Sequence, residues 1–169
     1  NVLAVMEGTP SESEVAQMSS PPPFGAWITI VDPALVHSGL QEAWLEAALR
    51  EGGGHSWLRL DGRRPLLIHT DPLNDSEDVD GFVVASGEIV QHRLRPPELH
   101  TIDQTAASAA RKGIGKLTLR CSLDPDIHPT LQRRLDRELK EIDGDRGFMV
   151  DIDLERGSGS HKLYVVCKE

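Results

Sequence analysis

Apolar and alternating segments predict strands along most of the chain after residue 26. Residues 26–31 form a short apolar run, and residues 56–60 and 65–69 flank an Asp-Gly pair that is typical of a hairpin turn. Residues 82–94 are also rich in strand-forming side chains. Three later segments place apolar and polar side chains on opposite faces, and we expect them as strands: residues 116–123, 148–155 and 162–168.

Proline and glycine residues mark the ends of three predicted helices. The first is expected to begin at Asp32, whose side chain can cap it, and to run to about Arg50, before the glycines at 52–54. The second is expected over 96–112 and the third over 129–142, since apolar residues recur there at helical spacing.

The resulting order is β-α-β-β-β-α-β-α-β-β, which predicts an α/β (α+β) fold: a layered sandwich with a mixed sheet. Each of the last three strands carries a polar face. Such faces are typical of antiparallel or mixed sheets and argue against a buried parallel sheet.

The amino-terminal segment differs in composition from the rest of the chain. Residues 1–25 are acidic and proline-rich, with Ser-Glu-Ser-Glu at 11–14, and we expect a flexible tail or linker. Residues 26–169 are expected to form a single α/β domain. The chain starts without an initiator methionine, so we expect it to be part of a longer protein.

Charge is unevenly placed along the 169 residues. The net charge is −9, and residues 1–80 carry 13 acidic and 4 basic side chains, whereas residues 81–169 carry 14 of each. Nucleic-acid affinity comes largely from neutralising phosphates, so an acidic protein is a poor candidate for such binding. The acidic charge therefore argues against nucleic acid as a partner.

The two cysteines, Cys121 and Cys167, are too few for a disulfide scaffold and indicate a reducing compartment. Each lies in register with apolar neighbours, so we expect both to be reduced and buried. The chain has no run of about 18 apolar residues, and we expect no membrane span. These features predict an intracellular protein, cytoplasmic or nuclear.

No catalytic, cofactor or metal motif is complete. Asp32 follows an apolar strand as in nucleotide hydrolases, but the glycine-rich phosphate loop is missing. The acidic loop 71–81 resembles a calcium loop only in part, because Gly87 stands where the closing glutamate belongs. The seven histidines show no metal-ligand spacing. We therefore predict no catalytic residue, no metal and no cofactor, and no motif defines a known family.

The basic stretch over residues 111–120 is the candidate phosphate or nucleic-acid site, with cations at Arg111, Lys112, Lys116 and Arg120. It lacks the interleaved aromatic residues that stack on bases. The favoured alternative is structural: a helix end, followed by pairing of Lys116 and Arg120 with Asp151 and Asp153 on a neighbouring strand.

The first predicted helix has an apolar surface wider than a helix on a one-sided sheet needs. Leu45 and Leu49 point about 100° away from Trp44 on a helical projection. Two explanations stay open: burial of these three residues within the fold, or contact with another protein or a second copy of the chain. We narrowly favour the partner contact.

The leading hypothesis is a non-enzymatic protein-interaction or complex-subunit domain of a larger intracellular protein. The first alternative is an RNA- or phosphate-binding module that uses residues 111–120. The second is a hydrolase or transferase whose site is assembled from distant residues such as Asp32, His37 and His69.

Overall fold

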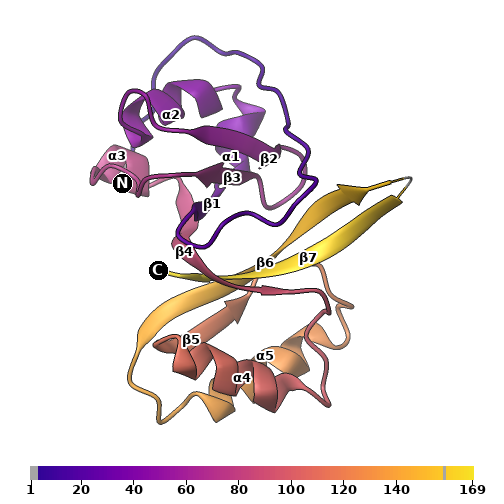
Figure 1. Ribbon diagram of the computed structural model, residues 1–169. Coiled ribbons are helices and arrows are strands. Elements are labelled where there is room, and N and C mark those ends of the chain that lie inside the picture. The colour runs from indigo at the N-terminus through magenta and orange to yellow at the C-terminus, as the bar shows by residue number, and fades with distance from the viewer. Residues whose placement is uncertain (1–3, 158) are drawn as a thin grey trace. The chain divides into compact units, whose positions relative to one another are not determined.

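The computed structural model describes residues 4–157 and 159–169 (Figure 1). Within these residues the strands are β1 Trp27–Val31, β2 His55–Arg59, β3 Leu66–His69, β4 Val83–Arg93, β5 Ile114–Leu119, β6 Asp145–Arg156 and β7 Gly159–Lys168. The helices are α1 Pro33–His37, α2 Gln41–Ala48, α3 Glu77–Asp80, α4 Ile102–Arg111 and α5 His128–Glu138. The strands form a mixed sheet in the order β2-β3-β1-β4-β7-β6-β5, which confirms the predicted α+β class.

Contacts divide the chain into two compact units. Unit 1 contains the described residues up to Gln17 together with Gly25–Ser86, and unit 2 contains Met18–Phe24 and Gly87–Glu169. Strand β4 contributes residues to both units, because the division falls between Ser86 and Gly87. Whether residues 26–169 fold together as a single domain, as the sequence predicts, stays a prediction.

The predicted tail is divided between the two units. Residues 5–17, which we call the strap, belong to unit 1, and Met18 pairs with Leu154 in unit 2. The strap is seated closely on α2: a Cβ built on Gly8 would lie 2.6 Å from the Ala43 Cβ, so a larger residue does not fit without a shift. The flexibility expected for this segment stays a prediction.

Unit 1 is built on an antiparallel sheet. β2 and β3 form the predicted hairpin, in which Trp57 lies opposite Leu67, and β1 pairs with β3 on its other side. Gly62 in the connecting turn has a φ of 75°, a conformation that glycine adopts without strain. The Asp-Gly signal in the sequence therefore identified this turn correctly.

The first predicted helix is two helices. Asp32 caps α1 as expected, since its Oδ1 accepts the Ala34 amide at 2.9 Å, and Pro33 is the first helical residue. The chain then breaks at Gly39, whose φ is 69°, before α2 begins. A Cβ built on Gly39 would lie 3.1 Å from the Pro10 Cβ of the strap, so close packing as well as the positive φ favours glycine here.

A short helix in the acidic loop completes the core of unit 1. The sequence predicted a plain loop over 71–81, but α3 forms there because Val79 is buried against α2. The Val79 carbonyl accepts the Trp44 indole N–H at 3.2 Å. Trp44 also packs near Trp57, with ring centroids 6.5 Å apart. The acidic loop is thus tied to the core by one apolar side chain and one hydrogen bond.

Unit 2 combines a sheet with two helices on one side of it. β6 pairs antiparallel with β7 and parallel with β5, so the sheet is mixed, as predicted. Helices α4 and α5 contact each other and both contact β5 (Figure 1). Leu117, Leu131 and Leu135 are fully or almost fully buried between them.

The second predicted helix begins later than expected. The Pro96-Pro97 pair restricts the preceding backbone to extended conformations, so the chain turns once more before α4 starts at Ile102. The third predicted helix is confirmed in place, with Pro129 in its first turn. It ends at Glu138, and Ile142 is 40 % exposed beyond it.

Burial of Leu49 predicts the effect of a charge at this position. Its side chain is 7 % exposed and packs in the core of unit 1, so Leu49→Asp would bury an unpaired carboxylate. We expect the free energy of unfolding to fall by about 3 kcal/mol or more, measured by urea denaturation. Leu94→Asp is the matched control, because Leu94 is 73 % exposed and the same charge should change stability by less than about 0.5 kcal/mol. Equal stability of the two variants would contradict the burial of Leu49.

Both cysteines are buried thiols, which predicts slow chemical labelling. Cys121 and Cys167 are each 0 % exposed, and burial raises the pKa of Cys167 well above its ordinary value, with a smaller contribution from Glu169. We expect a water-soluble maleimide to leave both residues unmodified in the native protein and to label both in urea. Rapid native labelling at either site, located by peptide mass spectrometry, would be inconsistent with this packing.

Candidate functional site

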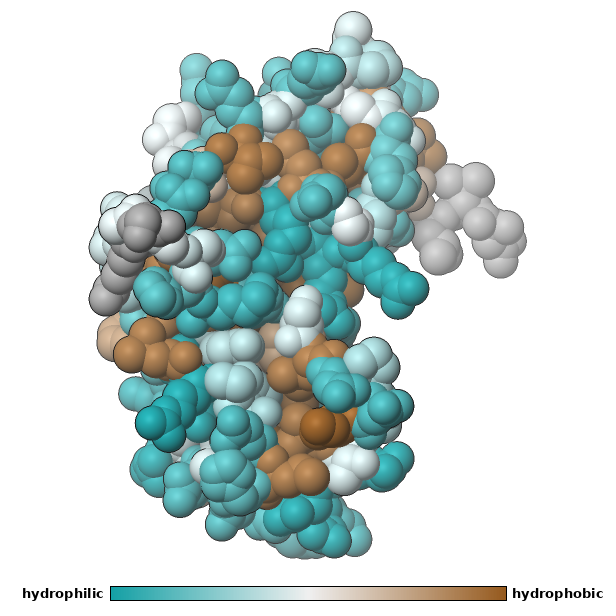
Figure 2. Space-filling view, turned by 90° about the vertical axis from the view of Figure 1, so that its right-hand side faces the viewer, coloured by the Kyte–Doolittle hydropathy of each residue, from teal (hydrophilic) through white to brown (hydrophobic). Residues whose placement is uncertain are grey.

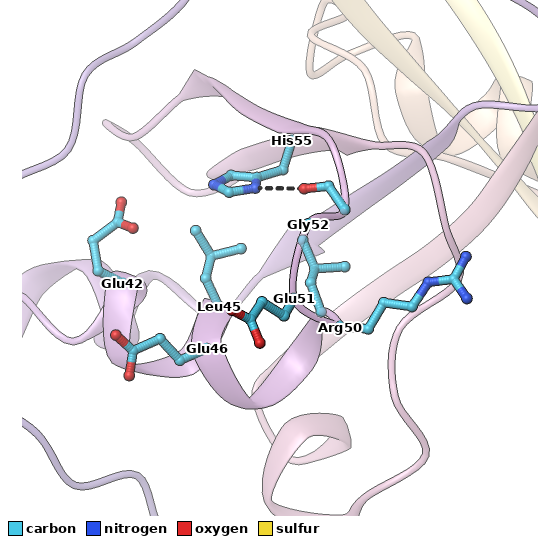
Figure 3. Close-up of a pocket in the computed structure, with 9 residues that line it drawn as sticks. Glu42, Leu45, Glu46, Arg50, Glu51, Gly52 and His55 are labelled. Atoms are coloured by element: carbon cyan, nitrogen blue, oxygen red, sulfur yellow. Dashed lines mark hydrogen bonds between the residues drawn. The ribbon is translucent and has the colours of Figure 1, made fainter.

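A cavity of about 490 Å³ lies in unit 1, where the carboxyl end of α2 meets the start of β2 (Figure 3). We call it the α2–β2 groove and define it by six of its lining residues: Glu42, Leu45, Glu46, Leu49, Glu51 and His55. The first four come from α2 and its C-cap, and the others from the turn and strand that follow. A helix, a glycine-rich turn and a strand edge thus supply all of the side chains.

Two leucines one helical turn apart form the apolar floor of the groove. Leu45 and Leu49 are 5 % and 7 % exposed, and both belong to the core of unit 1. In Figure 3 Leu45 points from α2 toward the His55 ring. The floor of the groove is therefore an edge of the hydrophobic core of unit 1.

The rim of the groove carries three carboxylates. Glu42 is half-buried and accepts the Trp57 indole N–H at 3.2 Å as well as the Ser13 hydroxyl of the strap. Glu46 and Glu51 are exposed, and neither forms a salt bridge with any residue in the described part of the chain. At least two carboxylates are thus available at the surface.

The neighbouring cation does not neutralise this rim. Arg50 turns away from His55 in Figure 3 and pairs with Asp71, with Nη2 and Oδ1 2.7 Å apart. The hydrogen bond and the charge of Asp71 raise the pKa of Arg50 above its ordinary value. The charge of Arg50 is therefore compensated by Asp71, and the carboxylates of Glu46 and Glu51 leave the groove negatively charged.

The structure separates the three residues that were predicted to contact a partner. Trp44 is 0 % exposed and lies in the core, where a partner does not reach it. Leu45 and Leu49 are also buried, but they line the groove from below. Trp44 is therefore buried within the fold, one of the two explanations left open by the sequence, and contact of Leu45 and Leu49 with a partner stays a prediction.

Exposed apolar residues do not offer an obvious alternative surface. The large hydrophobic side chains with substantial exposure are spread over many elements: Val5, Val15, Phe24, Val84, Leu94, Leu99, Ile127 and Ile142. On the face drawn in Figure 2, brown apolar areas are interrupted by teal hydrophilic side chains. Scattered side chains of this kind are normal on a protein surface.

The predicted phosphate site is partly neutralised. Arg111 and Lys112 lie exposed at the end of α4, and Lys116 follows on β5. Lys116 pairs with Asp136 of α5 at 3.4 Å, so its expected pairing with Asp151 and Asp153 is wrong.

The two strand carboxylates instead lie beside a cation on β7. Lys162 is 2.8 Å from Asp151 and 3.5 Å from Asp153, because β6 pairs antiparallel with β7. Arg120 follows β5 and is half-buried. Of the four cations, Lys116 is therefore paired and Arg120 is half-buried, whereas Arg111 and Lys112 stay exposed at the end of α4.

Histidine 69 lies in a buried chain of hydrogen bonds in unit 1. Its Nδ1 donates to the Asp71 carbonyl at 2.6 Å, so its Nε2 accepts the Thr29 hydroxyl at 2.7 Å. The Thr29 oxygen in turn lies 2.7 Å from the Ser86 hydroxyl. His69 and Thr29 are 2 % and 0 % exposed, so the chain of bonds holds a neutral imidazole inside the fold.

The other residues of the suggested enzyme site have separate local roles. Asp32 caps α1, and His37 is exposed in the last turn of the same helix. Among residues 4–157 and 159–169, no three His, Cys, Asp or Glu side chains converge in a way that could hold a metal ion. In the same part of the chain, every helix is too short or too polar to cross a membrane.

Sequence reasoning missed the contribution of Trp57 and Glu42. The strand at 56–60 was predicted, but nothing in the pattern indicated that the Trp57 indole reaches back to α2. The acidic spacing of Glu42 and Glu46 on one helix face was the available signal. It becomes informative only once Leu45 is placed beside them in the floor of the groove (Figure 3).

Comparison with protein-family models, curated proteins and solved structures gives no match to this chain. The function of the α2–β2 groove is therefore inferred from its own side chains.

The buried His69 predicts a pH dependence of stability. Burial is the main cause that lowers the pKa of His69, with a smaller lowering by His55, while the Asp71 carbonyl and carboxylate act in the opposite direction. Below its ordinary pKa, the unfolded chain takes up a proton that the folded chain resists, so the free energy of unfolding should fall as the pH drops below about 6.5.

His69→Gln removes this titration and should flatten the pH dependence of stability between about pH 7.5 and 5.5. Urea denaturation at several pH values measures it. His37→Gln, at an exposed position, is the matched control and should behave as the unaltered chain. An unchanged slope in His69→Gln would show that His69 does not contribute.

Proposed function

We propose that the chain is a protein-interaction domain whose α2–β2 groove binds a basic segment of a partner protein that carries an apolar residue. The observation that supports this most directly is the combination of the exposed carboxylates of Glu46 and Glu51 with the apolar floor of Leu45 and Leu49. An apolar side chain of the partner fills the cavity, and flanking Arg or Lys residues pair with the rim.

The charge of unit 1 favours such a partner. Residues 18–24 carry no charge, so unit 1 holds 13 acidic and 4 basic side chains and the whole net charge of −9. A field of this sign attracts a basic segment and speeds its approach, most strongly at low ionic strength. The same field repels a second copy of unit 1 and a nucleic acid, which makes a basic protein segment the better occupant.

The size of the cavity suits one or two side chains. At about 490 Å³ it is in the lower part of the range of small-molecule pockets and too small for a whole domain face. Contacts of this extent support weak and transient binding. The groove therefore fits a short peptide segment that exchanges rapidly.

Charge reversal at the rim tests the proposal. The probe is a fluorescein-labelled nonapeptide composed of Arg, Lys and Leu, and fluorescence anisotropy measures its dissociation constant. We expect the double variant Glu46→Lys with Glu51→Lys to weaken binding by about tenfold, because two attractive pairs become repulsive.

The control separates the groove from the overall field. Asp61→Lys with Asp75→Lys changes the net charge of unit 1 equally at exposed positions outside the groove, and should weaken binding by less than about threefold. A peptide with Ser in place of Leu should bind less tightly to the unaltered chain. Equal losses in both double variants, or no binding of the basic peptide, would refute the proposed site.

A further inference from the structure

The strap is attached to unit 1 by several separate hydrogen bonds. The Val5 amide donates to Asp78 Oδ1 at 3.1 Å, the Ser11 amide to the Gly39 carbonyl at 2.9 Å, and the Ala16 amide to the Trp57 carbonyl at 2.8 Å. Most strap side chains are exposed, with Ser13 half-buried among exposed neighbours. A segment with few buried side chains opens locally at low free-energy cost.

Ser13 connects the strap to α2 through its hydroxyl group. The hydroxyl donates to Glu42 Oε1 and accepts from the Gln41 Nε2 at 3.0 Å. The same Glu42 oxygen accepts the Trp57 indole N–H, so one carboxylate holds both the strap and β2. Within the described residues, the buried Oε1 of Gln41 has no hydrogen-bond partner. An unpaired buried oxygen makes the attachment of the strap to α2 less stable.

We propose that Ser13 is a phosphorylation site and that its modification detaches the strap from α2. A protein kinase would supply the phosphoryl group from a nucleoside triphosphate. The Ser13 Oγ–phosphorus bond forms, the bond from that phosphorus to the nucleoside diphosphate breaks, and the hydroxyl proton passes to the base of the kinase. Glu12 and Glu14 flank the serine, so a kinase with a basic substrate groove is the matching enzyme.

The charge of the phosphate explains why the strap would open. Phosphoserine lacks the hydroxyl group that donates a hydrogen bond to Glu42, and it adds a charge of about −1.5 to −2 at the same place. The phosphate would therefore face the Glu42 carboxylate in a half-buried site, where like charges repel strongly. The attached position of the strap is therefore disfavoured. When the strap detaches from α2, the Ala16 amide no longer donates to the Trp57 carbonyl.

Ser11 provides a matched control two residues away. Its backbone makes the bonds to Gly39 and Gln41, while its side chain is exposed. A phosphate at Ser11 adds the same charge to the same acidic stretch. It does not replace a hydroxyl group that donates to Glu42, because that hydroxyl group belongs to Ser13.

Amide hydrogen exchange of the full 169-residue chain tests the proposal. We expect Ser13→phosphoserine, introduced during synthesis, to speed exchange of the Ala16 amide by about tenfold or more, whereas Ser11→phosphoserine changes it by less than about twofold. Adding Glu42→Gln to the chain with phosphoserine at position 13 should restore part of the protection, because the repelling charge is gone. Unchanged exchange at Ala16, or equal effects of the two phosphoserines, would overturn the proposal.

A kinase assay tests access to the site. An acid-directed serine kinase with ATP should place phosphate on Ser13 of the folded chain, located by mass spectrometry, and Glu14→Lys should reduce the rate. Modification of a synthetic strap peptide but not of the folded chain would show that the strap does not open. No modification of either would show that the acidic flanks do not direct a kinase to Ser13, and both results would overturn the proposal.

Discussion

The placement of the Trp57 indole is the constraint on which the rest of unit 1 depends. The side chain is 3 % exposed, packs near Trp44, and donates its N–H to Glu42 of α2. Its backbone pairs with Leu67 in the hairpin and its carbonyl accepts the Ala16 amide of the strap. One residue therefore joins β2 to α2 and to the strap. A smaller side chain would leave a cavity in the core and release the Glu42 carboxylate from its partner.

Glu42 links the proposed partner site to the proposed modification site. It lines the α2–β2 groove, and its Oε1 already accepts bonds from Ser13 and Trp57. A cationic side chain in the groove would compete with the Ser13 hydroxyl for the same carboxylate. If both proposals hold, binding in the groove and attachment of the strap are coupled through this carboxylate, and by linkage each changes the free energy of the other by the same amount.

Local signals in the sequence predicted most elements, whereas tertiary contacts decided the rest. The Asp32 cap, the turn at Gly62 and the first turn of α5, which contains Pro129, all follow from backbone chemistry that acts within a few residues. The break at Gly39 and the helix around Val79 depend on the strap and on Trp44, which are distant in sequence. The expected partners of Lys116 failed for the same reason. Strand register decides which charges meet, and periodicity alone does not give the order of strands.

The sequence pointed to the first helix, but the form of the groove on it depends on tertiary contacts. The first helix was selected for its wide apolar surface, but its tryptophan belongs to the core, and at the surface three carboxylates surround two buried leucines. In unit 2, acids lie beside bases at Asp136–Lys116, Asp151–Lys162 and Asp145–Lys168, and its net charge is zero. In unit 1 the 13 acidic side chains outnumber the 4 basic ones, and one of these four, Arg50, is already paired with Asp71. Uncompensated charge lowers stability through self-repulsion, so the requirements of folding do not account for its concentration in one unit.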